Sequence, residues 1–189
     1  MFARTPRLLL RPGWSDDSAL LVAALNDEGV ARNLARVPFP YGPADAEQFL
    51  AQPQDPRHPN LLIFSRTNGP PRLVGGVGLV RGVSADADDR VELGYWIARP
   101  YWGLGFATEA ARALMQAVRA IGHRHVMARH AVDNPASGRV LRKLGFRPTG
   151  TTVRTPSRAR GADMLAALFE DGEGGTMAGG QVGLRYCVG

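Results

Sequence analysis

The segment "VELGYWIARPYWGLGFATEAARALMQAVRA", residues 91–120, decides the fold because it joins a strand-like run directly to a long amphipathic helix. The join contains the pattern Gly-x-Gly-x-Ala, from Gly103 to Ala107. The first turn of a helix has unpaired N–H groups and a positive dipole end, and glycines let an anion approach that backbone closely. The pattern is neither a Walker loop nor a dinucleotide fingerprint. From these residues alone, a phosphate site and a simple tight turn between strand and helix both stay open.

The elements around this segment separate into a helical part and a hairpin part. Apolar residues at helical spacing, such as Leu114 and Val118, support the helix after Gly105, and Gly122 is expected to end it. The glycine-rich run 73–80 predicts a strand with a bulge in preference to a phosphate loop. Helices kept apart from a run of hairpin strands indicate a mixed α/β sheet, not a doubly wound one. In chain order the predicted elements are a strand at 7–11, helices at 15–25, 28–35 and 44–52, strands at 61–67, 72–81 and 90–98, the helix after Gly105, a strand at 125–132, a helix at 134–144, and closing strands within 146–155 and 163–170.

The composition is that of a single soluble domain with an excess of positive charge. The chain has 189 residues and a formal net charge of +6, carried by 22 arginines and one lysine. The arginines are scattered and lack interleaved aromatic residues, which argues against nucleic-acid binding, while a basic surface suits any anionic ligand. The single cysteine, Cys187, excludes an intramolecular disulfide and a cysteine-based metal cluster. No apolar run approaches the roughly 18 residues of a membrane span and the N-terminus is a poor signal peptide, so we expect a cytoplasmic protein.

A second helix start follows one strand later, in "DNPASGRVLRKLGF", residues 133–146. Asn134 followed by Pro135 is good capping chemistry without any ligand. Ser137, however, falls on the same helix face as Leu141, which is expected to point inward. A buried hydroxyl at that position requires a hydrogen-bonding partner.

Taken together, "YWGLGFATEA" and "NPASGRVLRKLGF" resemble the GNAT superfamily of acetyl-CoA-dependent N-acetyltransferases. Upstream, "TPRLLLRP" and "ARNLARVPFPYGPADAEQFL" resemble its ribosomal-protein N-terminal acetyltransferase (RimJ/RimL-like) branch. The resemblance covers residues 5–169. It implies an α/β (α+β) GNAT fold, with a mixed, mostly antiparallel sheet splayed between its fourth and fifth strands and flanked by helices. It also implies a GNAT N-acetyltransferase domain at 1–170, followed by a Gly-rich tail at 171–189 that could add a strand.

The resemblance further implies where acetyl-CoA binds. The pantetheine arm would lie in the splayed gap, Asn134 would hydrogen-bond that arm, and Ser137 would donate a proton to the departing thiolate. The motif often starts with Gln or Arg where this chain has Trp102. Backbone contacts to the pantetheine arm would come from Trp96, Ile97 and Ala98, and contacts to the pyrophosphate from the N–H groups of Gly103, Leu104, Gly105, Phe106, Ala107 and Thr108.

Glu92 is a carboxylate inside the most strand-like segment. Strand alternation predicts that the Glu92 side chain lies on the same face of the strand as Gly94 and Trp96, and that Tyr95 lies on the other face. From the pattern alone, Glu92 is a carboxylate that is solvated or paired with Arg90. The resemblance implies a general base instead, because several family members place one at the matching position. An amine attacks a thioester only when neutral, and a lysine amine has a pKa of about 10.4 against about 8 for an α-amine, so a base has a use.

The remaining candidates carry less chemistry. His123 and His125 lie two residues apart near a loop, which does not suit a zinc site, and no metal is expected. His130 is expected on the strand facing the cleft, where it could contact substrate.

The predicted activity is direct acetyl transfer to a primary amine, preferably a protein N-terminus. The alternatives are a small amine acceptor (amino acid, polyamine or drug), a non-catalytic CoA-binding sensor, and a nucleic-acid binder; polyamines are disfavoured by the net charge, and the sequence leaves homodimer formation open.

Overall fold

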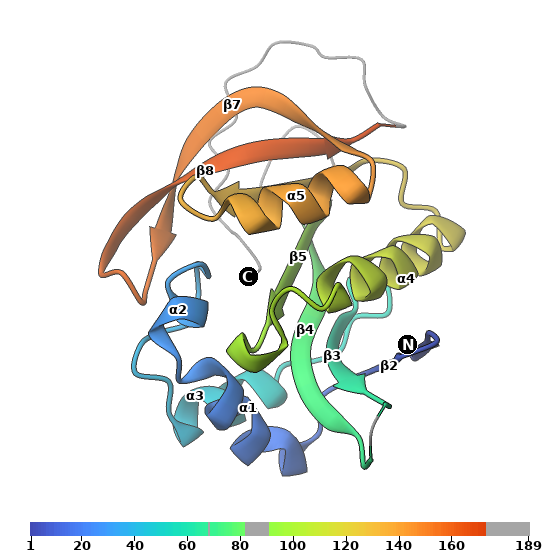
Figure 1. The fold of residues 1–189 in the computed structure, drawn as a ribbon, viewed down its shortest axis with the longest axis vertical. Coiled ribbons are helices and arrows are strands. Elements are labelled where there is room, and N and C mark those ends of the chain that lie inside the picture. Colours follow the sequence, from blue (N-terminus) through green and yellow to red (C-terminus); the bar gives the residue numbers. More distant parts are fainter. Residues whose placement is uncertain (68, 82–90, 173–189) are drawn as a thin grey trace.

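The computed structural model describes residues 1–67, 69–81 and 91–172 (Figure 1). Its strands are β1 (Ala3–Arg4), β2 (Leu8–Arg11), β3 (Asn60–Ser65), β4 (Arg72–Arg81), β5 (Val91–Ile97), β6 (Val126–Ala131), β7 (Phe146–Ser157) and β8 (Ala162–Asp171). Its helices are α1 (Ser18–Leu25), α2 (Glu28–Ala31), α3 (Pro43–Leu50), α4 (Phe106–Ala120) and α5 (Pro135–Lys143), with single 3₁₀ turns η1 (Ser15–Asp17) and η2 (Arg99–Tyr101). The predicted elements are therefore present, and the short strand β1 is an addition that the sequence pattern did not predict.

The described strands form one sheet in the order β1-β2-β3-β4-β5-β6-β8-β7. Neighbouring strands are antiparallel except β5 and β6, which run parallel. Their pairing joins only Val91–Leu93 to Val126–Ala128, whereas β5 stays paired with β4 as far as Ile97. We call the space between the second half of β5 and β6 the β5–β6 gap. Because β1 is a short addition, β5 and β6 are the predicted fourth and fifth strands, and the mixed, mostly antiparallel, open sheet is confirmed.

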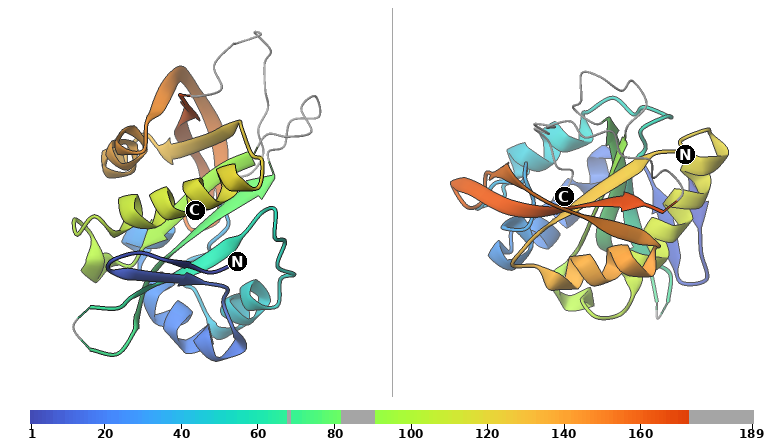
Figure 2. Two further views of the ribbon diagram at one scale, coloured as in Figure 1. Left: turned by 90° about the vertical axis from the view of Figure 1, so that its right-hand side faces the viewer. Right: turned by 90° about the horizontal axis from the view of Figure 1, so that it is seen from above.

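Helices cover both faces of this sheet (Figure 2). On one face, Val91 and Leu93 belong to the apolar cluster that includes the buried side of α4. On the other face, Trp96 and Ala98 belong to a second cluster with residues of α1, α2 and α3. The alternation expected of β5 is thus confirmed, and the strand contributes to two cores, one on each face.

The turn between β7 and β8 reaches back to the end of α2 (Figure 1). There the backbone N–H of Arg158 donates to the carbonyl of Ala35 at 3.1 Å, and Nε of Arg160 donates to the carbonyl of Arg32 at 2.7 Å. Arg160 also binds both carboxylate oxygens of Asp133 at 2.9 Å. The last carbonyls of a helix have no partner inside it, so the hairpin turn supplies partners just beyond α2.

Two sequence expectations about these elements have clear outcomes. The second helix was predicted over 28–35, but α2 ends at Ala31, because the carbonyls that follow accept hydrogen bonds from the hairpin turn. The strand with a bulge predicted at 73–80 is confirmed, since the β3–β4 register shifts between Ile63 and Phe64.

Some predicted features lie outside the described residues. These are Arg90 and the tail from residue 173 with Cys187. The last described strand ends at Asp171, and the domain boundary at 170 stays a prediction. Within the described part of the chain, no helix is both long enough and apolar enough to cross a membrane.

Candidate active site

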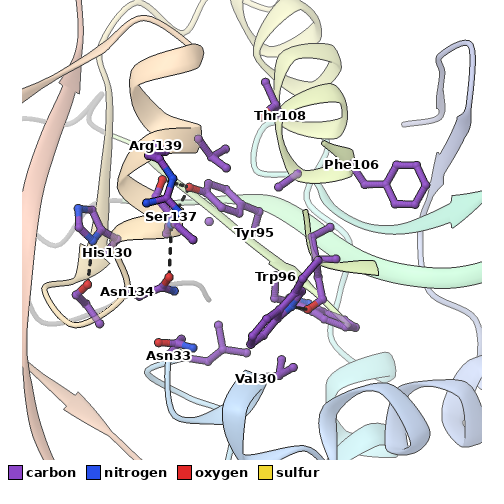
Figure 3. Close-up of a pocket in the computed structure, with 18 of the residues that line it drawn as sticks. Val30, Asn33, Tyr95, Trp96, Phe106, Thr108, His130, Asn134, Ser137 and Arg139 are labelled. Carbon is purple, nitrogen blue, oxygen red and sulfur yellow. Dashed lines mark hydrogen bonds between the residues drawn. The ribbon is translucent and has the colours of Figure 1, made fainter. Parts of the chain in front are cut away.

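A cleft of about 310 Å³ opens where β5 and β6 diverge (Figure 3). Its lining comes from the α2 region, β5, the loop before α4, β6 and the start of α5. Most residues predicted for the site line this one cleft: Trp96, Ile97, Gly103, Gly105, Phe106, Ala107, Thr108, Asn134 and Ser137. Glu92, Ala98 and Leu104 were predicted with them but are not among its lining residues.

The Gly-x-Gly turn forms one end of the cleft. Gly103 and Gly105 have φ of 79° and 81°, a region that disfavours residues with a Cβ. Gly105 is also the N-cap of α4, whose first turn exposes backbone N–H groups to the cleft at Phe106, Ala107 and Thr108. The tight-turn requirement is therefore real, and the same geometry suits a bound phosphate.

A brace from the turn between β1 and β2 holds the glycine turn in place. Both Nε and Nη2 of Arg7 lie 2.7 Å from Oε2 of Glu109, in the first turn of α4, and its Nη1 donates to the carbonyl of Leu104 at 3.0 Å. The hydroxyl of Thr5 donates to Glu109 Oε1 at 2.6 Å. Burial alone would raise the pKa of Glu109, but the hydrogen bonds from Thr5 and Arg7, with the charge of Arg7, hold that pKa below its ordinary value. Glu109 is thus an ionised anchor that ties the glycine turn to the sheet edge.

The hydroxyls of Tyr95 and Ser137 meet in the middle of the cleft (Figure 3). Tyr95 Oη lies 2.8 Å from Ser137 Oγ and donates to the backbone carbonyl of Ser137 at 2.9 Å. Burial raises the pKa of Tyr95 well above its ordinary value, although the hydrogen bond with Ser137 opposes that shift. Tyr95 is consequently a protonated donor at neutral pH. The partner expected for the inward-facing Ser137 hydroxyl is therefore a phenol.

Asn134 caps α5, as its position before Pro135 predicted. Its side-chain oxygen accepts the backbone N–H of Ser137 at 3.3 Å. This capping bond orients the first turn of α5 toward the cleft. A contact from Asn134 to a pantetheine arm stays a prediction.

Glu92 is engaged in a buried ion pair beside the cleft. It is 4% exposed, and its two carboxylate oxygens accept hydrogen bonds from Nε and Nη2 of Arg129 at 2.7 and 2.5 Å. Nη1 of Arg129 donates to the hydroxyl of Thr155 on β7 at 3.2 Å, and Arg129 itself lines the cleft. Arg129 therefore lies between Glu92 and the cavity, at the level where β5 and β6 diverge.

The strand register decides which backbone groups of β5 face the gap. The N–H of Ala98 donates to the carbonyl of Val74 on β4 at 2.9 Å. Antiparallel strands alternate between residues that bond to each other and residues whose N–H and C=O point to the opposite side. By this alternation the backbone groups of Trp96 and Ala98 are directed to β4, and those of Tyr95 and Ile97 point into the β5–β6 gap. The sequence predicted backbone contacts to the pantetheine arm from Trp96, Ile97 and Ala98. Of these three, the register directs only the backbone of Ile97 into the gap, and it adds that of Tyr95.

His130 lies at the cleft, as expected from its strand position. Its Nδ1 is 2.8 Å from the carbonyl of Ala131, and a carbonyl only accepts, so Nδ1 carries the proton. No group of three or more His, Cys, Asp or Glu side chains suited to a metal ion occurs among the described residues.

Tyr95, Arg129 and Arg7 are among the site residues that the sequence alone did not single out. A partial signal for Tyr95 existed, because strand alternation placed it on the other face of the strand from Glu92, but nothing in the sequence assigned the helix with Ser137 to that face. Arg7 and Arg129 had no such signal, since their partners are fixed only by the order of strands in the sheet.

The sequence matches a family model described as the acetyltransferase (GNAT) domain over residues 7–147. It is also 29% identical over 157 residues to the uncharacterized N-acetyltransferase YoaA of Bacillus subtilis strain 168. That match covers 77% of this chain and 82% of the relative.

Solved structures with a similar fold include two acetyltransferases with different names. The ribosomal-protein-S5-alanine acetyltransferase from Vibrio fischeri has a TM-score of 0.73 at 17% identity, covering 90% of this chain and 96% of that one. The microcin C7 self-immunity acetyltransferase MccE, in complex with acetyl-CoA and AMP, has a TM-score of 0.71 at 18% identity, covering 88% and 93%. At these identities the likeness shows the fold alone.

The brace between Arg7 and Glu109 yields a prediction about pH. Glu109→Gln should lower the free energy of unfolding by roughly 1 kcal/mol at neutral pH, the upper end for a partly exposed ion pair. The folded-state pKa of Glu109 lies below its ordinary value of 4.5, so its stabilisation is present above that value and is lost as the pH falls through the lowered pKa. The difference between parent and variant, measured by urea unfolding at several pH values, should therefore shrink in acid.

Glu47→Gln is the matched control, because Glu47 is exposed on α3. It should change the unfolding free energy little at any pH. A Glu109→Gln difference that stays constant into strong acid would contradict the ionised brace.

Proposed function

The chain belongs to the GNAT acetyltransferase domain family, and from that premise we propose that it moves an acetyl group from acetyl-CoA to the α-amine of a protein N-terminus. It is an acetyl-CoA-dependent N-acetyltransferase by family membership. The observation that carries the proposed mechanism is one cleft that joins the glycine turn at the start of α4 to the paired hydroxyls of Tyr95 and Ser137.

The residues of the cleft fit acetyl-CoA. The first turn of the 15-residue helix α4 offers backbone N–H groups to a pyrophosphate, next to two glycines with positive φ. Arg139 and Lys143 on α5 line the same cleft and suit further phosphate charge. The backbone N–H and C=O of Ile97, which point into the β5–β6 gap, suit hydrogen bonds to the amides of the pantetheine arm. When bound, acetyl-CoA supplies the thioester that is attacked.

The proposed transfer is direct. The lone pair of the neutral amine attacks the thioester carbonyl carbon, the carbon–sulfur bond breaks, and the sulfur departs as a thiolate that takes up a proton. A thiolate of this type has a solution pKa of about 8.5 and needs only modest help. We assign that help to Ser137. Its hydroxyl proton can be replaced from Tyr95 at 2.8 Å once the phenol O–H rotates from the Ser137 carbonyl to Ser137 Oγ.

Glu92 remains the predicted base, and its ion pair with Arg129 sets a condition on that role. Glu92 is not among the residues lining the cleft, so a water molecule has to carry the proton from the amine to its carboxylate. An α-amine with a pKa of about 8 is already roughly one-tenth neutral at pH 7, which makes a strong base unnecessary for this acceptor.

The choice of a protein N-terminus rests on the resemblance of the upstream segments to the ribosomal-protein acetyltransferases. A ribosomal-protein acetyltransferase is among the chains of similar fold, and so is an acetyltransferase of microcin self-immunity. A small amine acceptor is therefore the second candidate, favoured by the second of these likenesses.

The first functional prediction concerns the acid. Ser137→Ala should lower kcat by roughly one to two orders of magnitude, the low end of general-acid effects, because the leaving group is already a fair one. Tyr95→Phe should reproduce part of that loss. The rate of thiol release gives kcat, and calorimetry should show that the affinity for acetyl-CoA is unchanged. Ser15→Ala is the control, because Ser15 is exposed and is not among the residues that line the cleft. Unchanged turnover in Ser137→Ala would reduce Ser137 to a helix-terminus hydroxyl.

The second functional prediction concerns Glu92 as the general base. Glu92→Gln should slow acetylation of an α-amine by about 10²-fold or less at pH 7. Raising the pH to about 9 should restore much of the rate, because the substrate then deprotonates unaided. Thermal unfolding checks that the variant stays folded. A loss that persists unchanged at the higher pH would show that Glu92 only holds Arg129, and the base role would be contradicted.

The third functional prediction concerns which amine the enzyme acetylates. A short peptide with a free Ala or Ser N-terminus should be acetylated faster than the same peptide with a blocked N-terminus and an internal lysine, because the lysine amine is neutral to well under about one part in a thousand at pH 7. Preference for the blocked peptide, or for a free small amine, would sink the N-terminal assignment while the acetyltransferase activity stands.

A further inference from the structure

Trp102 stands at the start of the glycine turn, where its side chain folds back onto the end of β5. Its indole Nε1–H donates to the carbonyl oxygen of Ile97 at 2.6 Å. Both residues line the cleft, and Trp102 is 47% exposed. The indole therefore binds a backbone group of the cleft wall while the rest of its ring faces solvent.

The carbonyl that Trp102 binds belongs to the β5–β6 gap. Ile97 lies opposite Gly75 in the part of the ladder where backbone groups do not exchange hydrogen bonds, so its C=O is directed away from β4. On that side the parallel pairing with β6 has already ended, at Leu93. An extended ligand lying in this gap with amide N–H groups would meet the Ile97 carbonyl from the direction that the indole N–H now uses.

Trp102 is also held from its outer side. The guanidinium of Arg99 lies 5.5 Å from the centroid of the indole ring, within cation–π range. Arg99 in turn lies 3.4 Å from Oδ1 of Asp27, the residue whose side chain caps α2 through the N–H of Val30. The indole position is thus specified by two contacts, and displacing it costs both the hydrogen bond and part of the stacking.

We propose that the indole of Trp102 and an amide of the pantetheine arm compete for the carbonyl of Ile97, so that Trp102 weakens acetyl-CoA binding and sets its affinity. This inference rests on the proposed binding of acetyl-CoA in the β5–β6 gap. It assigns a role to Trp102, which stands where the motif often starts with Gln or Arg. A competing donor at this carbonyl favours release of the product CoA, a step that limits kcat in many enzymes.

The affinity test uses Trp102→Phe, which keeps an aromatic ring and removes the N–H donor. A net hydrogen bond corresponds to a factor of roughly two to ten in binding, so the dissociation constant of CoA, measured by calorimetry, should fall by that factor. Trp14→Phe is the matched control, because Trp14 is another exposed tryptophan stacked under an arginine, outside the cleft, and it should leave CoA affinity unchanged. Unchanged or weaker CoA binding by Trp102→Phe would overturn the competition.

A spectroscopic test observes the indole itself. The chain has three tryptophans, so ¹⁵N labelling gives three indole N–H signals, and Trp102→Phe identifies the relevant one. That signal should move upfield when CoA binds, and pantetheine without the nucleotide should produce the same shift, which removes the ring current of adenine as a cause. If calorimetry shows CoA bound and the Trp102 signal does not move, the inference fails alone. If the parent binds no CoA, the proposed function fails with it.

Discussion

The structure depends on the early end of the parallel ladder between β5 and β6. Three residues of β5 pair with β6, and after Leu93 the strand has a partner only on the β4 side. A strand edge without a neighbour presents unpaired N–H and C=O groups, which cost free energy unless something else binds them. Here the divergence puts the backbone of Tyr95 and Ile97 into a cleft, beside the helix start that follows Gly105. The site is therefore built from hydrogen-bonding capacity that the sheet leaves unused.

The buried pair of Glu92 and Arg129 sits where the two strands begin to separate. A charged pair inside a sheet contributes little net stability, because desolvating both groups offsets much of their attraction. Removing one partner is costly, however, since it leaves a charge behind in a buried position. With Thr155 as a third member, the pair links β5, β6 and β7 at this point. It thereby constrains how far the strands can separate, which is a geometric role whether or not Glu92 also takes up a proton.

Local chemistry was the part of the site that the sequence could predict. The glycine turn, the cap at Asn134 and the alternation along β5 depend on residues close in the chain, and their patterns are specific. The contacts that complete the site join distant segments: Tyr95 and Ser137 are 42 residues apart, Glu92 and Arg129 are 37 apart, and Arg7 lies 102 residues from Glu109. Such pairs follow from strand order and register, which propensities and spacing do not encode. For the same reason, Arg90 was the natural partner to expect for Glu92 from sequence, whereas its described partner is on β6.

The contact between the β7–β8 turn and α2 has a consequence for how such a chain can diverge. The matched family pattern ends at residue 147, before this turn, yet the turn supplies hydrogen bonds to the segment that follows α2 and so fixes one side of the cleft. Residues of that side, including Val30 and Leu34, contribute no backbone to the sheet. Insertions or substitutions in a surface turn are tolerated far better than changes in a core strand. Changes in the C-terminal hairpin can therefore alter the α2 side of the cleft while the half next to α4 and α5 stays unchanged.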